Sequence, residues 1–285
     1  MTRKVLKNSF IGLMLILIYL PIASMVLFSF NAHKSFTRFG GFSLRWYGEL
    51  FNHKEMMGAV VTTIIVAIVS TVISTIIGTL ASIAISRQRK VLRNLILSAN
   101  NIPIINPEII TAISLSVLFG IFFVPSGYTT MLLAHIAFST PYVIITVYPK
   151  VISLDPNLSD AAADLGATPV QTLTRVILPQ LKVAIVAGAA IAFTMSFDDF
   201  VISYFVSFGS SVKNISIYLY TLKRGMDPKI NALSTLIVLV IGLKVTYDYF
   251  ISGTRKSKWM KNRTFEEEPS NTLIDKSELK ERSII

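Results

Sequence analysis

Long runs of apolar residues, separated by shorter polar segments, dominate this chain. Six of the runs are long enough to cross a lipid bilayer as a helix, which needs about 20 residues. These runs cover residues 9–30, 58–85, 95–123, 130–151, 183–208 and 230–251. The pattern predicts an all-α, polytopic membrane protein whose six transmembrane helices form one domain over residues 1–265.

The two ends of the chain need separate interpretation. A signal peptide is the alternative for residues 9–30, but its apolar core spans only about 7–15 residues before a small-residue cleavage site. This run is longer and shows no clear site of that kind, so it is interpreted as the first membrane helix. Residues 266–285 contain an acidic run and little apolar content, which is typical of a disordered tail.

The third and fifth runs carry polar residues that modify this picture. Asparagines and prolines interrupt the third run between Asn100 and Pro107, and Asn106 with Pro107 predicts a new helix start that places Glu108 in its first turn. The fifth run contains two adjacent carboxylates, Asp198 and Asp199. If this run is a continuous helix, these two side chains point about 100° apart and border one cavity.

Composition agrees with a membrane protein. Of the 285 residues, 52% are hydrophobic and 15% are charged, and there is no cysteine, so neither a disulfide framework nor a thiolate metal site is expected. The net charge of +11 suggests nucleic acid as a partner, but the basic residues cluster at the ends of apolar runs, as at Arg87–Arg93. That distribution favours membrane lipid and argues against nucleic acid.

Basic residues also predict the orientation, because Lys and Arg concentrate in cytoplasmic loops. They are most frequent in the segments that a six-span protein with both termini inside places in the cytoplasm. The expected location is therefore the cell membrane, with both termini cytoplasmic. The segment between the fourth and fifth runs then also lies in the cytoplasm.

That segment, from Asp155 to Pro179, has the local signals of two short helices. Asp155 and Pro156 are expected to start the first helix, and Gly166 to end it in the left-handed conformation. Thr168 is expected to cap the second helix, with Pro169 at its first position and Gln171 reaching back to complete a capping box, and Pro179 is expected to end it. The result would be a helix–Gly–helix elbow, and an ordinary amphipathic connector is the alternative.

The elbow resembles the loop of binding-protein-dependent transporter permeases. The matching residues, in register, are Asp160, Ala161, Ala162, Gly166, Val176, Leu178 and Pro179, with Asp in place of Glu and Val in place of Ile as mild departures. The resemblance implies a type I importer permease fold and a coupling loop, residues 155–179, that docks onto a separate ATPase. The chain itself has no phosphate-binding G-x-x-x-x-G-K-[ST] and no HExxH motif, so it is expected to bind no cofactor and to perform no chemistry.

Ionisable residues inside membrane helices are costly and are candidates for function. Glu108, Asp198 and Asp199 are expected about 20 Å from the inner surface, counting about 1.5 Å per helical residue. Three carboxylates at similar depth suit a polycation, and Tyr19 in the first run would add an aromatic face. Lys244 and Asp248, four residues apart, are interpreted as a mutual pair or as side chains that snorkel to the membrane interface, and His135 is interpreted as a satisfied interhelical residue.

Residues 193–209 and 218–236 resemble the spermidine/putrescine permeases, specifically the member of the pair that carries a Ser-x-Asp-Asp motif, here Ser196, Asp198 and Asp199. The resemblance implies ATP-driven import of polyamines by a heterodimer with a second homologous permease, two copies of a cytoplasmic ATPase and an extracytoplasmic polyamine-binding protein. The substrate-pathway candidates are Asp198, Asp199, Ser196, Glu108, Tyr19, Trp46 and Tyr148. Trp46, in the loop after the first run, is assigned to receiving the substrate or its carrier, with interfacial anchoring as the alternative.

Two other functions stay open at this point. One is a related permease for thiamine, iron or an amino acid. The other is a membrane enzyme that uses Asp198 and Asp199 as metal ligands, which is weak because no third ligand has a matching spacing. Dependence of uptake on ATP and a binding protein would separate a permease from an enzyme.

Overall fold

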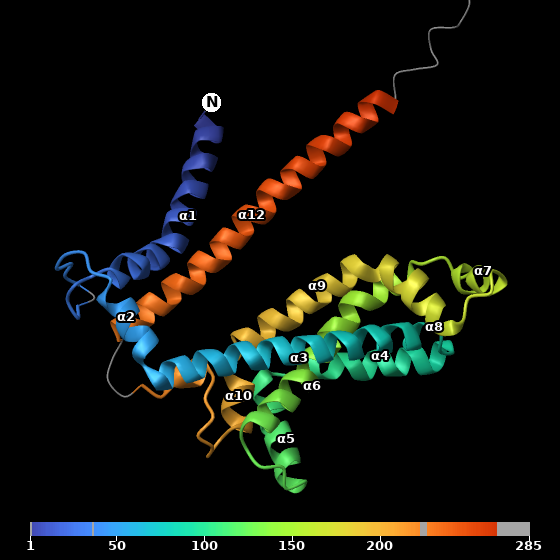
Figure 1. Cartoon of the computed structure of the whole chain (residues 1–285), viewed down its shortest axis with the longest axis horizontal. Helices are drawn as coiled ribbons and strands as arrows, with labels where there is room; N and C mark the ends of the chain where they lie inside the picture. The colour runs from blue at the N-terminus through green and yellow to red at the C-terminus, as the bar shows by residue number, and fades with distance from the viewer. Residues whose placement is uncertain (1, 36, 223–226, 267–285) are drawn as a thin grey trace, which may run out of the picture. The chain divides into compact units, whose positions relative to one another are not determined.

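The computed structural model describes residues 2–35, 37–222 and 227–266, with side chains described from residue 6 to residue 247 of these ranges. The described part is helical, with α1 to α12 and one π-helix, η1 (Figure 1). It divides into two units, residues 1–50 with 226–285, and residues 51–225. Most of the predicted tail, from residue 267 onward, lies outside the described residues, as does the side chain of Asp248.

The first unit contains α1 (Thr2–Ser29), α2 (Arg45–Asn52, whose last two residues belong to the second unit) and α12 (Pro228–Glu266), and α1 contacts α12. The loop between α1 and α2 folds around Asn31, which is fully buried. Its amide group donates to the carbonyls of Ser35 and Arg38, while its Oδ1 accepts from Gly40 N–H at 2.7 Å. These bonds satisfy backbone groups of a loop that has no sheet ladder to do so.

The second unit is built on three long helices, α3 (Lys54–Ser86), α6 (Tyr128–Ile152) and α9 (Leu178–Phe197), which all contact one another. Small residues allow the close approach. A Cβ on Gly78 of α3 would lie 2.7 Å from Val143 Cβ on α6, so only glycine fits there. Several hydroxyls on α3 bond to carbonyls of their own preceding turn, as in Ser82 Oγ to Gly78 O at 2.7 Å. The hydroxyl therefore needs no water.

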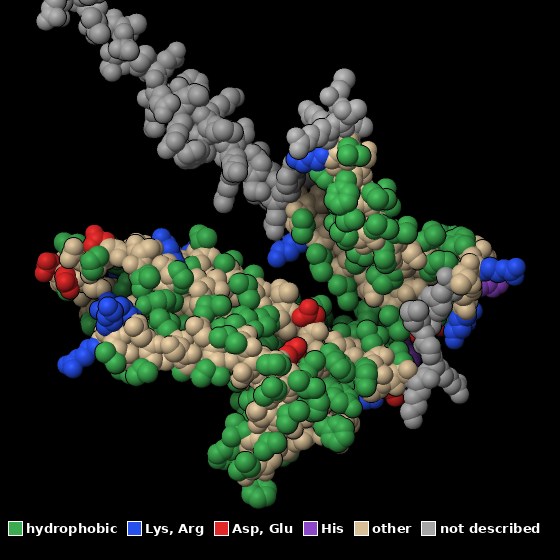
Figure 2. Space-filling view, turned by 180° about the vertical axis from the view of Figure 1, so that it is seen from behind, with side chains coloured by type: hydrophobic (Ala, Val, Ile, Leu, Met, Phe, Trp, Pro, Cys, Tyr) green, Lys and Arg blue, Asp and Glu red, His purple; other side chains and the backbone are tan. Residues whose placement is uncertain are grey.

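Smaller helices complete this unit. They are α4 (Lys90–Ile105), α5 (Glu108–Ile121), α7 (Leu158–Asp164), α8 (Pro169–Gln171), η1 (Thr172–Ile177), α10 (Val201–Val206) and α11 (Ile215–Tyr220). One apolar cluster lies around Met131 and Phe138 of α6 and includes residues of α3, α5, α10 and α11. Many apolar side chains are exposed on the face that Figure 2 shows, as expected for helices in lipid.

The prediction of six spans agrees with the structure under one condition. Among the described residues, five helices are long and apolar enough to cross a membrane, and there are six spans if the pair α4 and α5 counts as one. That pair is bent by 105° at its break. The predicted helix start before Glu108 is confirmed, because α5 begins at that residue. The bend contradicts the straight helix from which the depth of Glu108 was counted, so that depth stays a prediction.

The fifth span is also interrupted, which corrects the continuous helix assumed for residues 183–208. α9 ends at Phe197, Asp198 is its C-cap, and α10 starts at Val201. Asp198 and Asp199 therefore lie at a helix break and not on one helical face. The 100° separation assumed for them does not apply.

The elbow confirms its predicted glycine and its capping box. Gly166 has φ +79°, and the N–H groups of Gly166 and Ala167 donate to Ala163 O and Ala162 O, the two bonds that close a helix with a left-handed residue. Thr168 and Gln171 cap each other's backbone, at 2.9 and 3.3 Å.

Both outer ends of the elbow differ from the prediction. α7 begins at Leu158 and not at Pro156, because Asp155 Oδ1 accepts from Asn157 N–H and forms a turn instead. Pro179 does not end a helix, since one helical segment runs from Pro169 to Phe197. The six-residue π-helix before the proline widens the helix where the proline N–H is missing, and this accommodates its ring.

Candidate functional site

The break between α9 and α10 holds the two adjacent carboxylates in different surroundings. The side chain of Asp199 is buried and caps α10 by accepting from the N–H groups of Ile202 (3.2 Å) and Ser203 (2.8 Å). Ser203 Oγ–H donates to the same carboxylate at 2.6 Å. Asp198 is exposed, and its carboxylate makes no hydrogen bond or ion pair with any described residue. Of the two carboxylates, Asp198 is the exposed one and Asp199 is the buried one.

Asp199 also faces His135 of α6, whose ring is 1% exposed. His135 Nε2 lies 3.3 Å from Asp199 Oδ2 and 2.9 Å from Ser203 Oγ, while Nδ1 lies 2.6 Å from Ser196 Oγ. The interpretation of His135 as a satisfied interhelical residue is confirmed. Ser196, assigned to the substrate pathway, is 2% exposed and belongs to this buried network. The structure therefore gives Ser196 no open surface.

Glu108 lines a cavity of about 150 Å³ in the second unit. The cavity lies at the bend between α4 and α5, and its lining consists of Pro103, Asn106, Glu108, Thr111, Phe138, Tyr142, Met195 and Ile202. One carboxylate, one amide and two aromatic rings are a suitable lining for an alkylammonium group, because the cation is attracted by the charge and by the ring faces. Phe138 and Tyr142 were missed from the sequence, since nothing in a fourth apolar run distinguishes them from packing residues.

The remaining predicted pathway residues are elsewhere. Tyr148 is half-buried on α6, two turns away from Tyr142 along the helix. Tyr19 is exposed on α1 in the other unit. Trp46 is 1% exposed, and its Nε1–H donates to Asn31 O at 2.5 Å, so its indole is buried in the fold of the first unit. An exposed receiving surface or interfacial anchor at Trp46 is not what the structure shows.

At the elbow, the matched residues differ in exposure. Asp160, Ala161 and Gly166 are exposed, whereas Ala162 is buried. Leu178 and Pro179 start α9, beyond the π-helix. The glycine end of α7 is therefore exposed, together with Asp160 in its first turn.

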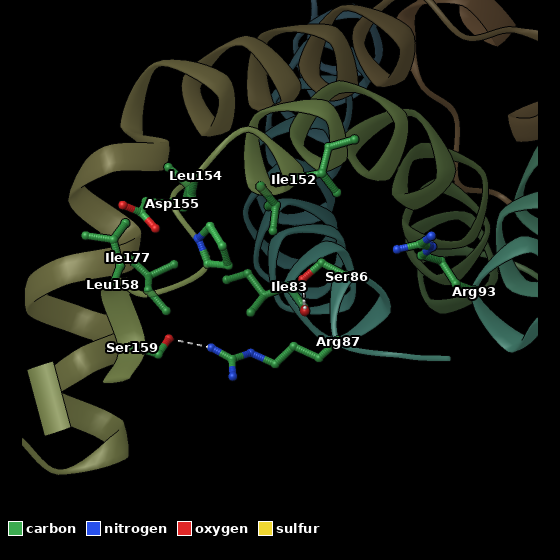
Figure 3. Close-up of a pocket in the computed structure, with 12 residues that line it drawn as sticks. Ile83, Ser86, Arg87, Arg93, Ile152, Leu154, Asp155, Leu158, Ser159 and Ile177 are labelled. Atoms are coloured by element: carbon green, nitrogen blue, oxygen red, sulfur yellow. Dashed lines mark hydrogen bonds between the residues drawn. The ribbon is translucent and has the colours of Figure 1, made fainter. Parts of the chain in front are cut away.

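A cavity of about 320 Å³ lies behind the elbow (Figure 3). It is lined by the end of α3, the start of α4, the end of α6 with the loop that follows it, α7, and the end of η1. Arg87 spans from α3 to the elbow, and its Nη2 donates to Ser159 Oγ at 2.7 Å, while Arg93 points into the cavity from α4 (Figure 3). This hydrogen bond links α7 directly to the first long helix of the unit.

The second unit thus combines three long helices that contact one another with a capped elbow between α6 and α9. Residues 74–255 match the family described as "Binding-protein-dependent transport system inner membrane component". The chain belongs to this family. It is therefore a multi-pass inner-membrane permease component.

Characterised relatives cover most of the chain. It is 34% identical over 241 residues to the "Spermidine/putrescine transport system permease protein PotC" of Haemophilus influenzae, which covers 84% of this chain and 93% of the relative. It is 32% identical over 244 residues to PotC of Escherichia coli K12, covering 85% and 92%. Its identity to the "Putrescine transport system permease protein PotI" of the same strain is 34% over 233 residues, covering 79% and 83%.

Solved structures show the same fold at low sequence identity. A bacterial ABC transporter that imports the acidic polysaccharide alginate aligns with a TM-score of 0.64 and 15% identity, covering 88% of this chain and 96% of the other. An amino acid ABC transporter aligns with a TM-score of 0.52 and 17% identity, covering 74% and 98%. These similarities establish the permease fold of ABC importers and carry no information about the substrate.

Proposed function

We propose that this chain is one permease subunit of an ATP-driven importer of polyamines, spermidine or putrescine, and forms half of the translocation pathway. The observation that carries the proposal is the cavity at Glu108, where a carboxylate faces Phe138 and Tyr142. The names of the relatives support the same substrate class. Asp198 is the second exposed carboxylate of the pathway in this proposal.

The cavity suits one end of a polyamine. A buried water needs roughly 10–15 Å³ of space, so about 150 Å³ is room for about ten water-sized groups, enough for an ammonium group with a chain of methylenes. A polyamine has several cationic ends, and binding one at a time keeps each contact weak enough to release. The open side of the cavity, where Glu108 itself is exposed, gives the next amine access to the same carboxylate.

The partners follow from the family. We propose a heterodimer with a second homologous permease, two copies of a cytoplasmic ATPase bound at the elbow, and an extracytoplasmic polyamine-binding protein. The elbow and both termini then lie in the cytoplasm, as the distribution of Lys and Arg favours. ATP hydrolysis belongs to the partner ATPase and not to this chain.

Reconstitution tests the function. The chain would be assembled with its partner permease, ATPase and binding protein in proteoliposomes, and uptake of labelled spermidine and putrescine would be measured with and without ATP. Uptake that requires ATP and the binding protein supports the proposal. ATP-dependent uptake of thiamine, iron or an amino acid, with none of either polyamine, would overturn the substrate assignment and leave the permease.

The cavity has its own test. Glu108→Gln removes the charge and preserves the size of the side chain, so polyamine uptake should fall by about tenfold, the effect of losing one charge-assisted contact. Glu55→Gln is the matched control, because Glu55 is an exposed residue in the first turn of α3 and lines no part of the cavity. Equal uptake by both variants would remove Glu108 from the pathway.

A further inference from the structure

A continuous chain of buried polar side chains connects five helical segments of the second unit. It runs from Ser70 on α3 to Ser196 on α9 and from there to His135 on α6. His135 contacts Ser203 on α10, and Ser203 bonds to Asp199, which precedes α10 in the sequence. Asn214, before α11, completes it, since its Nδ2 donates to Asp199 O at 2.8 Å and to Ser203 Oγ at 2.9 Å. All six side chains are buried.

The hydrogen-bond donors around Ser203 determine the state of one ring nitrogen of His135. Ser203 Oγ–H donates to the Asp199 carboxylate, and the two lone pairs of the same oxygen remain to accept. Asn214 Nδ2–H supplies one of these bonds. His135 Nε2, at 2.9 Å, therefore has to donate the other, which means that Nε2 carries a proton.

The second ring nitrogen fixes the ring from the opposite side. His135 Nδ1 lies 2.6 Å from Ser196 Oγ, the last buried residue of α9 before the break, and Ser196 Oγ lies 3.0 Å from Ser70 Oγ. The ring thus bridges the end of α9 to the start of α10. It spans the interruption that contains Asp198, while α6 carries it on a long, well-packed helix.

We propose that His135 is a positioning residue of the transport pathway, which uses its Nε2–H to hold Asp199 and Ser203 and so fixes the helix break that presents Asp198. The adjacent carboxylates then have different roles. Asp199 is a structural acceptor in the His135 network, and of the two aspartates only Asp198 serves, with Glu108, as a counter-charge. The role of Asp198 rests on the proposed function, whereas the state of His135 and its coupling to Asp199 do not.

Two substitutions of His135 separate the contributions of the ring nitrogens. In His135→Gln the side-chain amide reaches as far as Nε2 and can still donate to Ser203, whereas in His135→Asn it reaches only as far as Nδ1. We expect His135→Gln to keep most of the transport rate and His135→Asn to lose about tenfold, because Ser203 loses a buried donor. His33→Gln is the control, since His33 is exposed in a loop of the other unit.

Nitrogen-15 NMR of the full chain in lipid nanodiscs provides a readout that does not depend on transport. The chain has only three histidines, so each imidazole signal is assigned by its loss in one variant. We expect a protonated Nε2 at His135 whose shift moves in Asp199→Asn and stays unchanged in Asp198→Asn. This measurement on the wild-type chain remains decisive if His135→Asn does not fold.

The outcomes distinguish the two proposals. An unprotonated Nε2 or equal shifts in both aspartate variants would overturn the positioning role, and so would equal transport by His135→Gln and His135→Asn in an importer whose wild type transports polyamine. If the NMR result is as expected but the reconstituted importer transports no polyamine, the proposed substrate is wrong and the positioning role of His135 stands.

Discussion

Gly166 offers the sharpest test of the elbow, because its conformation and its surroundings are both defined. It ends α7 at φ +79°, a region that residues with a Cβ rarely adopt. A Cβ built on Gly166 meets nothing within 4 Å. A substitution there is therefore penalised by its own backbone and not by a clash with a neighbour.

The size of the expected effect follows from the backbone penalty alone, because no clash adds to it. Placing an ordinary residue in the left-handed region costs about 1–2 kcal/mol, and a β-branched side chain such as valine lies at the upper end. α7 is only seven residues long, so it has little else to hold this conformation. A cost of about 1–2 kcal/mol corresponds to a factor of about 5–30 in the population of the capped elbow.

The assay compares Gly166→Val with Gly166→Asn in the complete complex. Asparagine tolerates the left-handed conformation, so it should preserve the elbow, while valine should weaken ATPase binding or stimulation by about 5–30-fold. Insertion of the chain in the membrane should be unaffected in both, because Gly166 lies in an exposed loop outside the spans.

Either of two results would refute this reasoning. Wild-type ATPase binding and uptake in Gly166→Val would mean that the capped conformation is not needed for docking. Equal losses in the valine and asparagine variants would mean that a side chain at this surface blocks the partner, and that the backbone conformation is not the cause.

Three further predictions concern how the fold is held together. Gly78→Val should lower the stability of the protein by about 1–3 kcal/mol, because the added Cβ would lie 2.7 Å from Val143. Gly58→Val should leave the stability unchanged, because Gly58 has open space around it. Thermal unfolding in nanodiscs measures both variants. Trp46→Leu should lower the stability of the protein by about 2 kcal/mol, because it removes buried apolar area and a hydrogen bond, while uptake per folded protein stays constant. A loss of uptake at unchanged stability would instead support a direct role of Trp46 in receiving the substrate. Asn214→Ala should destabilise the protein by about 2 kcal/mol, because it removes the cap of α11 at Ile217 N–H and two buried hydrogen bonds. Asn214→Ser retains a cap, so its stability should lie between those of the wild type and Asn214→Ala. Equal Tm values for the wild type and both variants would contradict this prediction.

The parts of the fold that depend on local interactions could be predicted from the sequence. Gly166 and the Thr168–Gln171 capping box needed only neighbours within a few residues, and both are confirmed. The helix start before Glu108 is local for the same reason, since proline has no N–H to lose at a helix start. The chain bends by 105° at that start. The direction of the bend depends on packing against other helices, and the apolar pattern does not predict it.

The errors share the opposite cause. Pro179 was expected to end a helix by local chemistry, but the π-helix before it accommodates the ring. Trp46 was assigned to receiving the substrate or its carrier because it is an amphipathic aromatic residue in an outer loop, whereas its N–H donates to Asn31 O, 15 residues away, and its indole is buried. The pair assigned to Lys244 and Asp248 stays a prediction, because the side chain of Asp248 is not described.

The adjacent aspartates show most directly why a motif does not define a site. In sequence they are equivalent: two carboxylates in one apolar run, both costly in lipid and both suited to a polycation. The structure distinguishes them through residues that are distant in the chain, with His135 61 positions before Ser196 and Asn214 15 positions after Asp199. A carboxylate that accepts three hydrogen bonds and faces a histidine has its cost in the membrane offset by the protein itself. Asp198 has no such partner among the described side chains, so its cost remains to be offset by water or by a cation that passes through.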